Sequence, residues 1–546
     1  MKKYIGLIIG ILICLAVIGA SYYWATSLMD SVYAYRSPLR YTPPQPGENL
    51  GKPIPRSLVI VLIDALRYDT SMNADVMPFL NQLRSEGASA LMHSRPPSYS
   101  EPGYSVLLTG AWPDLSDGPA INLDYADIPT FTQDNIYSAA HRAGLSTAIS
   151  AFNWFEKLVP QQAVTASFYT AGEDQVADQQ VVEAALPWLR NGNYQLVLIH
   201  IDQVDYAGHH EGGPIDLRWD EAASRADALL KEIATTMDLT QDTLLVLSDH
   251  GQIDIGGHGG QDPIVLREPF VLAGKGVIQG EYSDVQMVDV APTLAAILGT
   301  NIPATSQGHV LISMFDFSLD KVGAINAALA AQQAQLALAY QDAIGQPVKV
   351  AASEDVVTAT QKAMAAAEST KLTNERIPRG IVAFVVILGL LVLAGWYAGP
   401  NYCWMVLGVV SYLVIFNIKY LFIDQKTYSL SSVIDATNLI TSTALTTLLA
   451  LFLGWLLVIL GTRIYHLKPR KAAELTMKFV LVALSFLAVP IFFNYFIDGA
   501  VVTWVLPNFL FSFLGLIFLI QALVVALIGL FLTGISPLLG YFSQGK

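Results

Sequence analysis

The sequence is poor in cysteine and in charge. Two cysteines among 546 residues exclude a small scaffold held together by disulfide bonds. Charged residues make up 14% of the chain, well below the roughly one quarter of soluble domains, so a wholly soluble protein is excluded as well. Basic residues are the scarcer charge, with 31 against 45 acidic ones and a net charge of −14. Because binding to nucleic acid requires a basic surface, we expect no nucleic acid partner.

What the sequence has instead is long apolar segments at both ends. An apolar run over 5–24 follows Lys2 and Lys3, and its length fits a membrane helix. A cleaved signal peptide is the alternative for this segment. After Arg379 the composition becomes almost wholly apolar. We expect five further spans there, over 380–398, 402–423, 437–461, 477–497 and 507–533.

Basic residues in one connection predict the topology. The connection between the third and fourth of these spans carries Arg463, Lys468, Arg470, Lys471 and Lys478. Short loops rich in lysine and arginine stay in the cytoplasm. Three predicted spans separate this connection from the polar region before 380, so that region lies on the opposite, outer side of the membrane. The N-terminal lysines agree with this orientation. We therefore expect a multi-pass plasma-membrane protein with its polar region on the extracytoplasmic side. The oligomeric state is left open.

The chain divides into five parts by composition. An anchor over 1–25 precedes a linker over 26–56 that contains six prolines and is expected to be extended. Residues 57–315 form the predicted globular domain. An Ala- and Gln-rich segment over 316–379 is expected to be helical, either as a spacer or as a support packed on that domain. Residues 380–546 form the membrane domain.

The globular domain alternates strands and helices. Three near-continuous apolar runs, over 57–63, 195–201 and 243–248, are each followed directly by an aspartate. Strands that are apolar on both faces belong to a buried, mainly parallel sheet. Helices are expected between them, over 77–86, 132–143 and 220–237. The pattern predicts an α/β sandwich, with its site beyond the carboxyl ends of the strands.

Carboxylates and imidazoles gather beyond these strands. Five of the nine histidines fall within 59 residues of sequence. Such side chains on loops after neighbouring strands bind borderline metals such as zinc and manganese, and nearby glycines let the backbone turn tightly. His200, inside a strand, is interpreted as packing, and His210 as pointing away. The candidate ligands are Asp64, Asp205, His209, Asp249, His250 and His258.

Four segments in this order resemble the alkaline phosphatase superfamily, whose members bind two metal ions: 60–69, 205–209, 247–251 and 288–299. Within it the chain is most similar to type I phosphodiesterases/nucleotide pyrophosphatases and to glycosylphosphatidylinositol (GPI) ethanolamine phosphate transferases. The Asp-Ala-Leu-Arg-Tyr-Asp string over 64–69 and the multi-span C-terminus resemble the latter. The resemblance covers about 57–315 and implies an alkaline-phosphatase-like sandwich with a mainly parallel central sheet.

The resemblance also implies a nucleophile. In these families a Thr or Ser precedes a helix that leads to Thr-Gly, and the segment 97–110 matches this frame with Ser100 as the nucleophile. Ser98 is the alternative. Sulfatases of the superfamily need an arginine four positions after the nucleophile, where this chain has Tyr104. Sulfatase activity is therefore disfavoured.

Two divalent metal ions follow from the resemblance, zinc in the first place and manganese as the alternative. It implies that Asp205, His209 and His258 hold one ion. Asp64, Asp249 and His250 would hold the other, with Ser100 joining as an alkoxide. Asn122 lies about one residue from the position where nucleotide pyrophosphatases place an asparagine that holds a non-bridging oxygen.

The resulting hypothesis is a membrane-anchored two-metal phosphoesterase or phosphotransferase. It would act on a phosphodiester, with a lipid-linked donor or acceptor favoured by the membrane anchors, through a phosphoryl-serine-type intermediate. Water as acceptor makes it a phosphodiesterase, and a glycolipid hydroxyl makes it a phosphoethanolamine-type transferase. Less favoured functions are a phosphomonoesterase, a sulfatase and a transporter with a non-catalytic exported domain. Arg67 and Arg95 are candidates for holding further phosphate oxygens.

Overall fold

The computed structural model describes residues 4–544, which separate into two compact units. The sheet unit consists of Tyr33–Leu372 and Thr503–Leu506. The helical unit consists of the described residues up to Val32, Thr373–Val502 and the described residues from Pro507 onward. Lys2 and Lys3, which enter the topology prediction, lie outside the described residues.

The sheet unit contains one nine-stranded sheet in the order β4-β3-β5-β1-β6-β7-β2-β8, with β9 also paired to β2. β1 lies between β5 and β6 and is parallel to both, whereas β7 is antiparallel to both of its neighbours. The strands are β1 (Leu58–Ile63), β2 (Ala88–His93), β3 (Thr147–Phe152), β4 (Ala166–Thr170), β5 (Leu196–Ile201), β6 (Thr243–Leu247), β7 (Arg267–Gly274), β8 (Gly280–Glu281) and β9 (Val285–Gln286).

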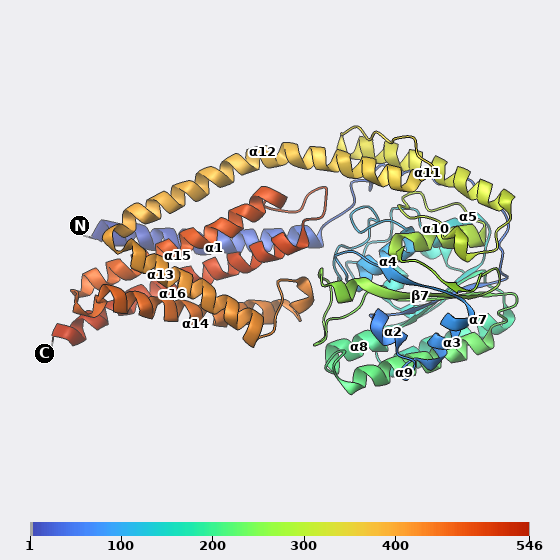
Figure 1. Cartoon of the computed structure of the whole chain (residues 1–546), viewed down its shortest axis with the longest axis horizontal. Helices are drawn as coiled ribbons and strands as arrows, with labels where there is room; N and C mark the ends of the chain where they lie inside the picture. The colour runs from blue at the N-terminus through green and yellow to red at the C-terminus, as the bar shows by residue number, and fades with distance from the viewer. Residues whose placement is uncertain (1–3, 545–546) are drawn as a thin grey trace. The chain divides into compact units, whose positions relative to one another are not determined.

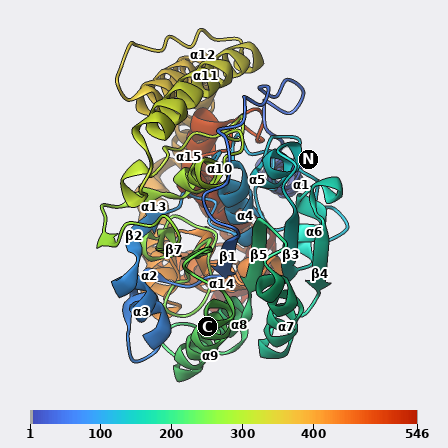
Figure 2. The same cartoon turned by 90° about the vertical axis from the view of Figure 1, so that its right-hand side faces the viewer.

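Helices cover both faces of this sheet (Figures 1 and 2). They are α2 (Tyr68–Met72), α3 (Pro78–Glu86), α4 (Ser100–Thr109), α5 (Ile136–Arg142), α6 (Trp154–Leu158), α7 (Gln175–Asn191), α8 (Gln203–His210), α9 (Leu217–Thr236), α10 (Val290–Leu298) and α11 (Leu319–Ile344). Alternate residues of β1 enter two different cores. Leu58, Ile60 and Leu62 pack with α4, α5 and α10, whereas Val59, Val61 and Ile63 pack with α3, α7 and α9. The predicted mainly parallel α/β sandwich is confirmed.

Two predicted helices begin elsewhere than expected, because capping side chains set their starts. α5 begins at Ile136 rather than at 132, after Asn135, whose side chain accepts from Ser138 N–H. α9 begins at Leu217 rather than at 220, after Asp216, whose side chain accepts from Arg218 N–H. A polar side chain that accepts from a free N–H of the first turn favours a helix start at that point.

The structure differs from the sequence prediction on either side of the globular domain. α1 (Ile5–Tyr33) continues past the predicted end at 24, so the first residues of the predicted linker are helical. α12 (Val356–Ala398) runs through Arg379 without a break, whereas we expected the helical segment over 316–379 to be separate from the span that begins at 380. α11 buries Ile325 and Leu329 in the main core, which favours a support over a free spacer.

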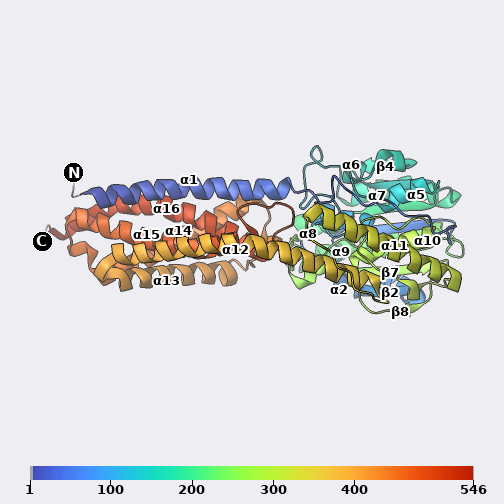
Figure 3. The same cartoon turned by 90° about the horizontal axis from the view of Figure 1, so that it is seen from above.

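Five helical segments of the described chain are long and apolar enough to cross a membrane: Ile5–Tyr33, Val356–Ile423, Ala436–Thr462, Pro469–Asp498 and Phe509–Leu539. The second contains both predicted spans over 380–398 and 402–423. A 3₁₀ turn at Gly399–Asn401 separates α12 from α13 (Tyr402–Ile418), and the chain reverses there (Figures 1 and 3). The remaining long helices are α14 (Ala436–Thr462), α15 (Pro469–Asp498) and α16 (Phe509–Gln544).

Candidate active site

Three parallel strands deliver aspartates to one edge of the sheet. In the register of β1, Ile63 lies beside Ile201 of β5, and Leu62 lies beside Leu247 of β6. Asp64, Asp202 and Asp249 follow these strands within two residues, so they emerge at the same edge. All three are buried. The carboxyl ends of parallel strands are the usual place of a site in an α/β sheet.

Ser100 lies beside this edge as the first residue of α4. Its Oγ is 3.1 Å from His250 Nε2, and both side chains are buried. The close approach depends on Gly103, because a Cβ there would lie 2.8 Å from the Cβ of Asp249. A larger residue at 103 would push α4, and with it Ser100, away from the strand end.

One group of ligand atoms surrounds His250. His250 Nε2 lies 3.5 Å from Asp64 Oδ1 and 3.5 Å from Asp249 Oδ2. The three residues form a group that could hold one metal ion. The oxygens Asp64 Oδ1 and Asp249 Oδ2 are buried and have no hydrogen-bond partner in the structure.

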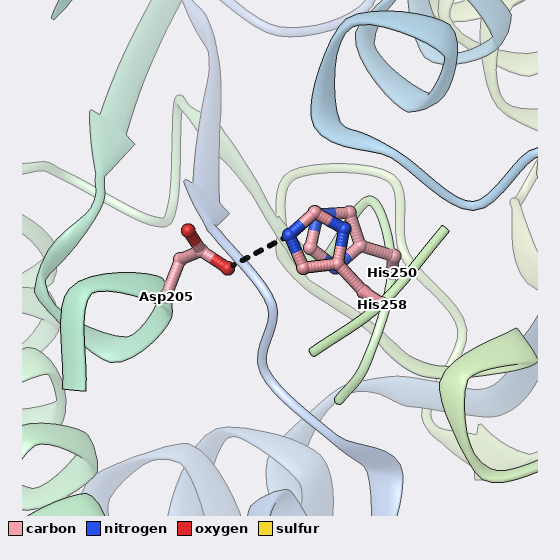
Figure 4. A group of neighbouring side chains, drawn as sticks. All are labelled: Asp205, His250 and His258. Atoms are coloured by element: carbon pink, nitrogen blue, oxygen red, sulfur yellow. Dashed lines mark ion pairs between the residues drawn. The ribbon is translucent and has the colours of Figure 1, made fainter. Parts of the chain in front are cut away.

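A second group surrounds Asp205 at the start of α8 (Figure 4). Asp205 Oδ1 lies 3.6 Å from His258 Nε2, and the rings of His250 and His258 stack at 4.0 Å. Asp205, His250 and His258 form a group that could hold a metal ion. His209 Nε2 is 2.9 Å from His258 Nε2 and 3.4 Å from Asp205 Oδ2. The structure thus brings His209 together with its two predicted partners and adds His250 to the same neighbourhood.

Glycine allows the loop that carries His258 to reach α8. Gly256 has φ +84°, and a Cβ at this residue would lie 2.1 Å from the carbonyl oxygen of Gly208. A side chain is therefore excluded at this crossing both by space and by backbone conformation.

The pKa values of the buried groups in the cluster shift in different directions. Burial, together with the negative charge of Asp64, raises the pKa of Asp249 well above its usual range. Burial alone would raise the pKa of Asp205, but the imidazoles of His209, His258 and His250 lower it to about 2. Burial and the neighbouring His250 hold the pKa of His258 well below its ordinary value. A metal ligand must be deprotonated, and the lowered pKa values of Asp205 and His258 favour that form, whereas a cation bound at Asp249 would displace a proton.

The residues fit divalent metal ions by a further observation. Among residues 4–544, no lysine or arginine forms an ion pair with Asp64, Asp205 or Asp249. Buried carboxylates are costly unless they are paired or coordinate a metal. Oxygens left without a donor, beside histidine ring nitrogens, are the donor set that a divalent ion such as zinc takes.

Three residues that sequence reasoning did not include surround Asp64. His200 Nε2 lies 2.9 Å from Asp64 Oδ2, and the Tyr104 hydroxyl donates to the same oxygen and lies 3.1 Å from His200 Nε2. His200 is buried in β5, as expected, but it also forms with Asp64 and Asp202 a third group of metal-ligand type. Tyr104 lies one helical turn after Ser100, and this spacing was the signal available in the sequence. The strand-end position of Asp202 was the other.

The alternatives raised by the sequence have different partners. Ser98 Oγ donates to the carbonyl of Gly260 and accepts from Gly259 N–H, so it fixes the loop that carries His258. Arg67 pairs with Asp69 and, at 2.8 Å, with Asp254. The Arg95 guanidinium lies 4.2 Å from the centre of the Trp112 ring. His210 packs against the Tyr206 ring.

Asn122 lies next to the nucleophile position. Its Oδ1 accepts a hydrogen bond from the backbone N–H of Glu101, the residue after Ser100, at 3.1 Å. The hydrogen bond fixes the orientation of the amide group, and the amide nitrogen, which is the donor of the side chain, is left for another partner.

Comparison with known proteins identifies the family. The model of the type I phosphodiesterase/nucleotide pyrophosphatase family matches residues 58–115 and 124–380, more than half of the chain. The chain belongs to this family. The match spans the strand ends, Ser100 and the histidine loops described above, and it reaches into α12.

Individual relatives point in the same direction. The chain is 28% identical over 288 residues to human GPI ethanolamine phosphate transferase 2, catalytic subunit, a match that covers 49% of this chain and 29% of the relative. It is 27% identical over 301 residues to mouse GPI ethanolamine phosphate transferase 3, catalytic subunit, covering 50% of this chain and 27% of the relative. The matches thus span less than a third of each transferase.

Among solved structures, human ectonucleotide pyrophosphatase/phosphodiesterase 5 matches with 12% identity and a TM-score of 0.37, covering 45% of this chain and 95% of that protein. With its family, its five helices of spanning length and its acid–imidazole groups, the chain is a multi-pass membrane protein that carries a candidate divalent-metal site.

Proposed function

We propose that the protein transfers a phosphoethanolamine-type group from a phospholipid to a hydroxyl of a glycolipid, through a covalent intermediate on Ser100. The observation that carries the proposal is the position of Ser100 Oγ, 3.1 Å from His250 and at the edge where the buried aspartates converge. The similarity to GPI ethanolamine phosphate transferases supports the choice of donor and acceptor.

The reaction is a double displacement at phosphorus. In the first step Ser100 Oγ bonds to phosphorus, the bond to the lipid alcohol breaks, and the proton of the serine ends on that alcohol. In the second step the glycolipid hydroxyl bonds to phosphorus and Ser100 Oγ leaves and regains a proton. A nucleophilic serine divides one difficult substitution into two easier ones.

Asp64, Asp249 and His250 would hold one divalent ion next to Ser100. Asp205, His209 and His258 would hold the other, and His250 lies within reach of both groups. We propose zinc, with manganese as the alternative, because the ligands mix carboxylate and imidazole. When bound, the two ions supply positive charge that lowers the pKa of the nucleophile and offsets charge on the phosphoryl oxygens.

Other residues of the chain orient the reacting group. The amide nitrogen of Asn122 would donate to a non-bridging phosphoryl oxygen, because its amide oxygen is held by Glu101 N–H. The N-terminal end of α4 faces the same region through Ser100, and free N–H groups at a helix start favour anions. Tyr104 and His200 would hold Asp64 in place rather than contact the substrate.

We further propose that the sheet unit lies on the extracytoplasmic face of the plasma membrane. Arg463 and Lys468 lie in the connection between α14 and α15, and Arg470 and Lys471 lie in the first turn of α15. This cluster of basic residues supports the orientation. A donor and an acceptor that are both lipids would then reach the site by lateral diffusion.

The test uses the full-length chain in lipid nanodiscs, with labelled phosphatidylethanolamine and a GPI acceptor. We expect label to appear on the glycolipid, and the Ser100→Ala variant to lose at least about a thousandfold in rate while the protein stays folded. Ser98→Ala is the matched control, and we expect it to retain activity within about tenfold, since Ser98 only fixes a loop.

Each outcome of this test decides a different point. Release of free phosphoethanolamine without labelled acceptor would favour a phosphodiesterase over a transferase. Loss of activity in Ser98→Ala with retention in Ser100→Ala would refute the nucleophile.

A further inference from the structure

A polar groove lies at the edge of the sheet, outside the metal-ligand cluster. It has a volume of about 480 Å³, within the range of small-ligand sites. It lies over β2 between α2, α3 and the segment that carries β8. The residues that carry the argument are Tyr68, Arg84, Arg267, Glu281 and Tyr282.

One end of the groove lies at the same edge of the sheet as Ser100. β7 runs antiparallel to β6, so that its first residues lie beside the carboxyl end of β6, with Phe270 opposite Leu247. Arg267, which opens β7, pairs in register with His93 at the end of β2. Tyr68 begins α2, four residues after Asp64. From Arg267 and Tyr68 the groove follows β2 back to Gly87 and Gly280.

Three of the groove's polar groups form no hydrogen bond or ion pair, although Tyr68 and Glu281 lie near enough to Arg84 to act on the pKa of its guanidinium. In the part of the chain that the structure describes, no hydrogen bond or ion pair engages the Tyr68 hydroxyl, the Arg267 guanidinium or the Glu281 carboxylate. Arg267 only faces the Tyr68 ring, at 5.7 Å. Arg67, one residue before Tyr68, is by contrast held by two carboxylates.

The rest of the groove is fixed in place. The Arg84 guanidinium donates to Ser71 O at 3.0 Å and to Asn81 Oδ1 at 2.6 Å, which joins α3 to the end of α2. The Tyr282 hydroxyl donates to Ile278 O at 3.0 Å, and Tyr282 N–H donates to Ser89 O at 2.8 Å. The open donors and acceptors therefore lie on a rigid frame, and a rigid frame lowers the entropic cost of binding.

The chemistry of these groups selects a class of ligand. An arginine offers donors only, a carboxylate offers acceptors only, and a tyrosine hydroxyl offers both. A sugar presents hydroxyls that both donate and accept, and apolar ring faces that pack on tyrosine. Two arginines, Arg84 and Arg267, and two carboxylates, Glu281 and Asp284, line the groove, so its formal charges balance. A neutral polar ligand such as a sugar fits this balance better than a phosphate or another anion.

We propose that this groove binds a sugar of the glycolipid acceptor and so selects the hydroxyl that receives the phosphoryl group. The inference rests on the proposed function for its acceptor, but the binding of sugar can be measured without any turnover. Arg267, Glu281 and Tyr68 contact the sugar hydroxyls, and the Tyr68 and Tyr282 rings pack against its faces.

The experiment compares the wild-type chain with the double variant Arg267→Ala/Glu281→Ala, both full-length in nanodiscs. Both side chains are exposed and unpaired, so the fold should be retained. The matched control is Arg190→Ala/Glu232→Ala, which removes one exposed arginine and one exposed glutamate from α7 and α9. Saturation-transfer NMR with mannotriose and maltotriose reports binding. Hydrolysis of bis(p-nitrophenyl) phosphate reports the intact reaction centre.

We expect at least one trisaccharide to receive saturation from the wild type and the control but not from the groove variant. In lipid transfer, the KM for the glycolipid should rise at least about tenfold in the groove variant, whereas diester hydrolysis should stay within about twofold. No saturation transfer to either sugar, or equal transfer in the groove variant, would overturn the proposal. Sugar binding that depends on the groove, without any lipid transfer, would instead support the sugar site and refute the proposed function.

Discussion

The two units of the chain bury polar side chains of different kinds. In the helical unit these are mostly hydroxyls and amides, such as Thr447, whose Oγ1 donates to Thr443 O of its own helix, and Ser485, which donates to Val482 O. In the sheet unit they include the carboxylates Asp64, Asp202 and Asp249 at one strand edge. A hydroxyl can donate to a carbonyl of its own helix, whereas an ionised carboxylate can only accept and, when buried, needs N–H donors or a positive charge.

The buried polar groups of the sheet unit are thus suited to a metal-dependent reaction, whereas those of the helical unit are suited to helix packing. The ionisable pair Lys419–Asp424 of the helical unit, 2.7 Å apart, is mutually neutralised. In the described chain, Asp64 Oδ1 and Asp249 Oδ2 accept no hydrogen bond and pair with no lysine or arginine. A transporter with a non-catalytic exported domain predicts the reverse distribution.

The largest expected effect comes from removing metal. Dialysis against a chelator should lower diester hydrolysis at least about a thousandfold, because metal ions contribute several kcal/mol to such reactions, and zinc or manganese should restore it. Hydrogen exchange should become faster in β1 and β6 and remain unchanged in α13–α16. Activity that survives chelation with metal content near zero would contradict the claim that the buried carboxylates of the sheet unit hold a catalytic metal.

An intermediate effect is expected from Tyr104→Phe. The change removes the hydroxyl that donates to Asp64 and keeps the ring that packs 4.5 Å from Phe155. Loss of a partner that holds a metal ligand lowers metal affinity by about 10–100-fold, and a competition titration with a metal indicator measures this.

Tyr137→Phe is the control for this variant. It removes a buried hydroxyl that bonds to Ala148 O, away from the cluster. Equal metal affinity of the Tyr104→Phe variant and the wild type would show that Tyr104 only packs.

The smallest effect is expected in the helical unit. Asp424→Asn breaks the pair with Lys419, which is partly exposed, and such pairs contribute about 0–1 kcal/mol. Diester hydrolysis should stay within about twofold of the wild type, with a small drop in thermal stability. A loss of diester hydrolysis comparable to that of Ser100→Ala would show that the helical unit takes part in the reaction.

The fold was predictable because the apolar runs of β1, β5 and β6 are continuous, and continuous runs indicate a buried parallel sheet. The reversal of β7 was not, since an apolar strand carries no mark of its direction. The predicted helix starts were wrong where the capping residue lay elsewhere than expected: Asn135 starts α5 later, and Asp216 starts α9 earlier. The continuity of α12 was missed because a change of composition at Arg379 was interpreted as a structural boundary.

The candidate ligands that the sequence marked all lie in one cluster, because loops after parallel strands meet at one edge. Their assignment to particular ions stays a prediction. His200 and Tyr104 were missed for a physical reason: both are buried on regular elements, where a polar side chain looks like core. The groove could not be found from sequence either, since its walls come from segments that are far apart in the chain.

The reversed direction of β7 separates two tasks that share one edge of the sheet. Metal-type side chains follow the central parallel strands, whereas the groove is built on the outer strands β2, β7 and β8. Under the proposed function, residues of the outer strands can change and alter which acceptor is bound without disturbing the reaction centre. If the chain is the proposed transferase, directed evolution confined to 279–284 and Arg267 would be the economical route to a new acceptor.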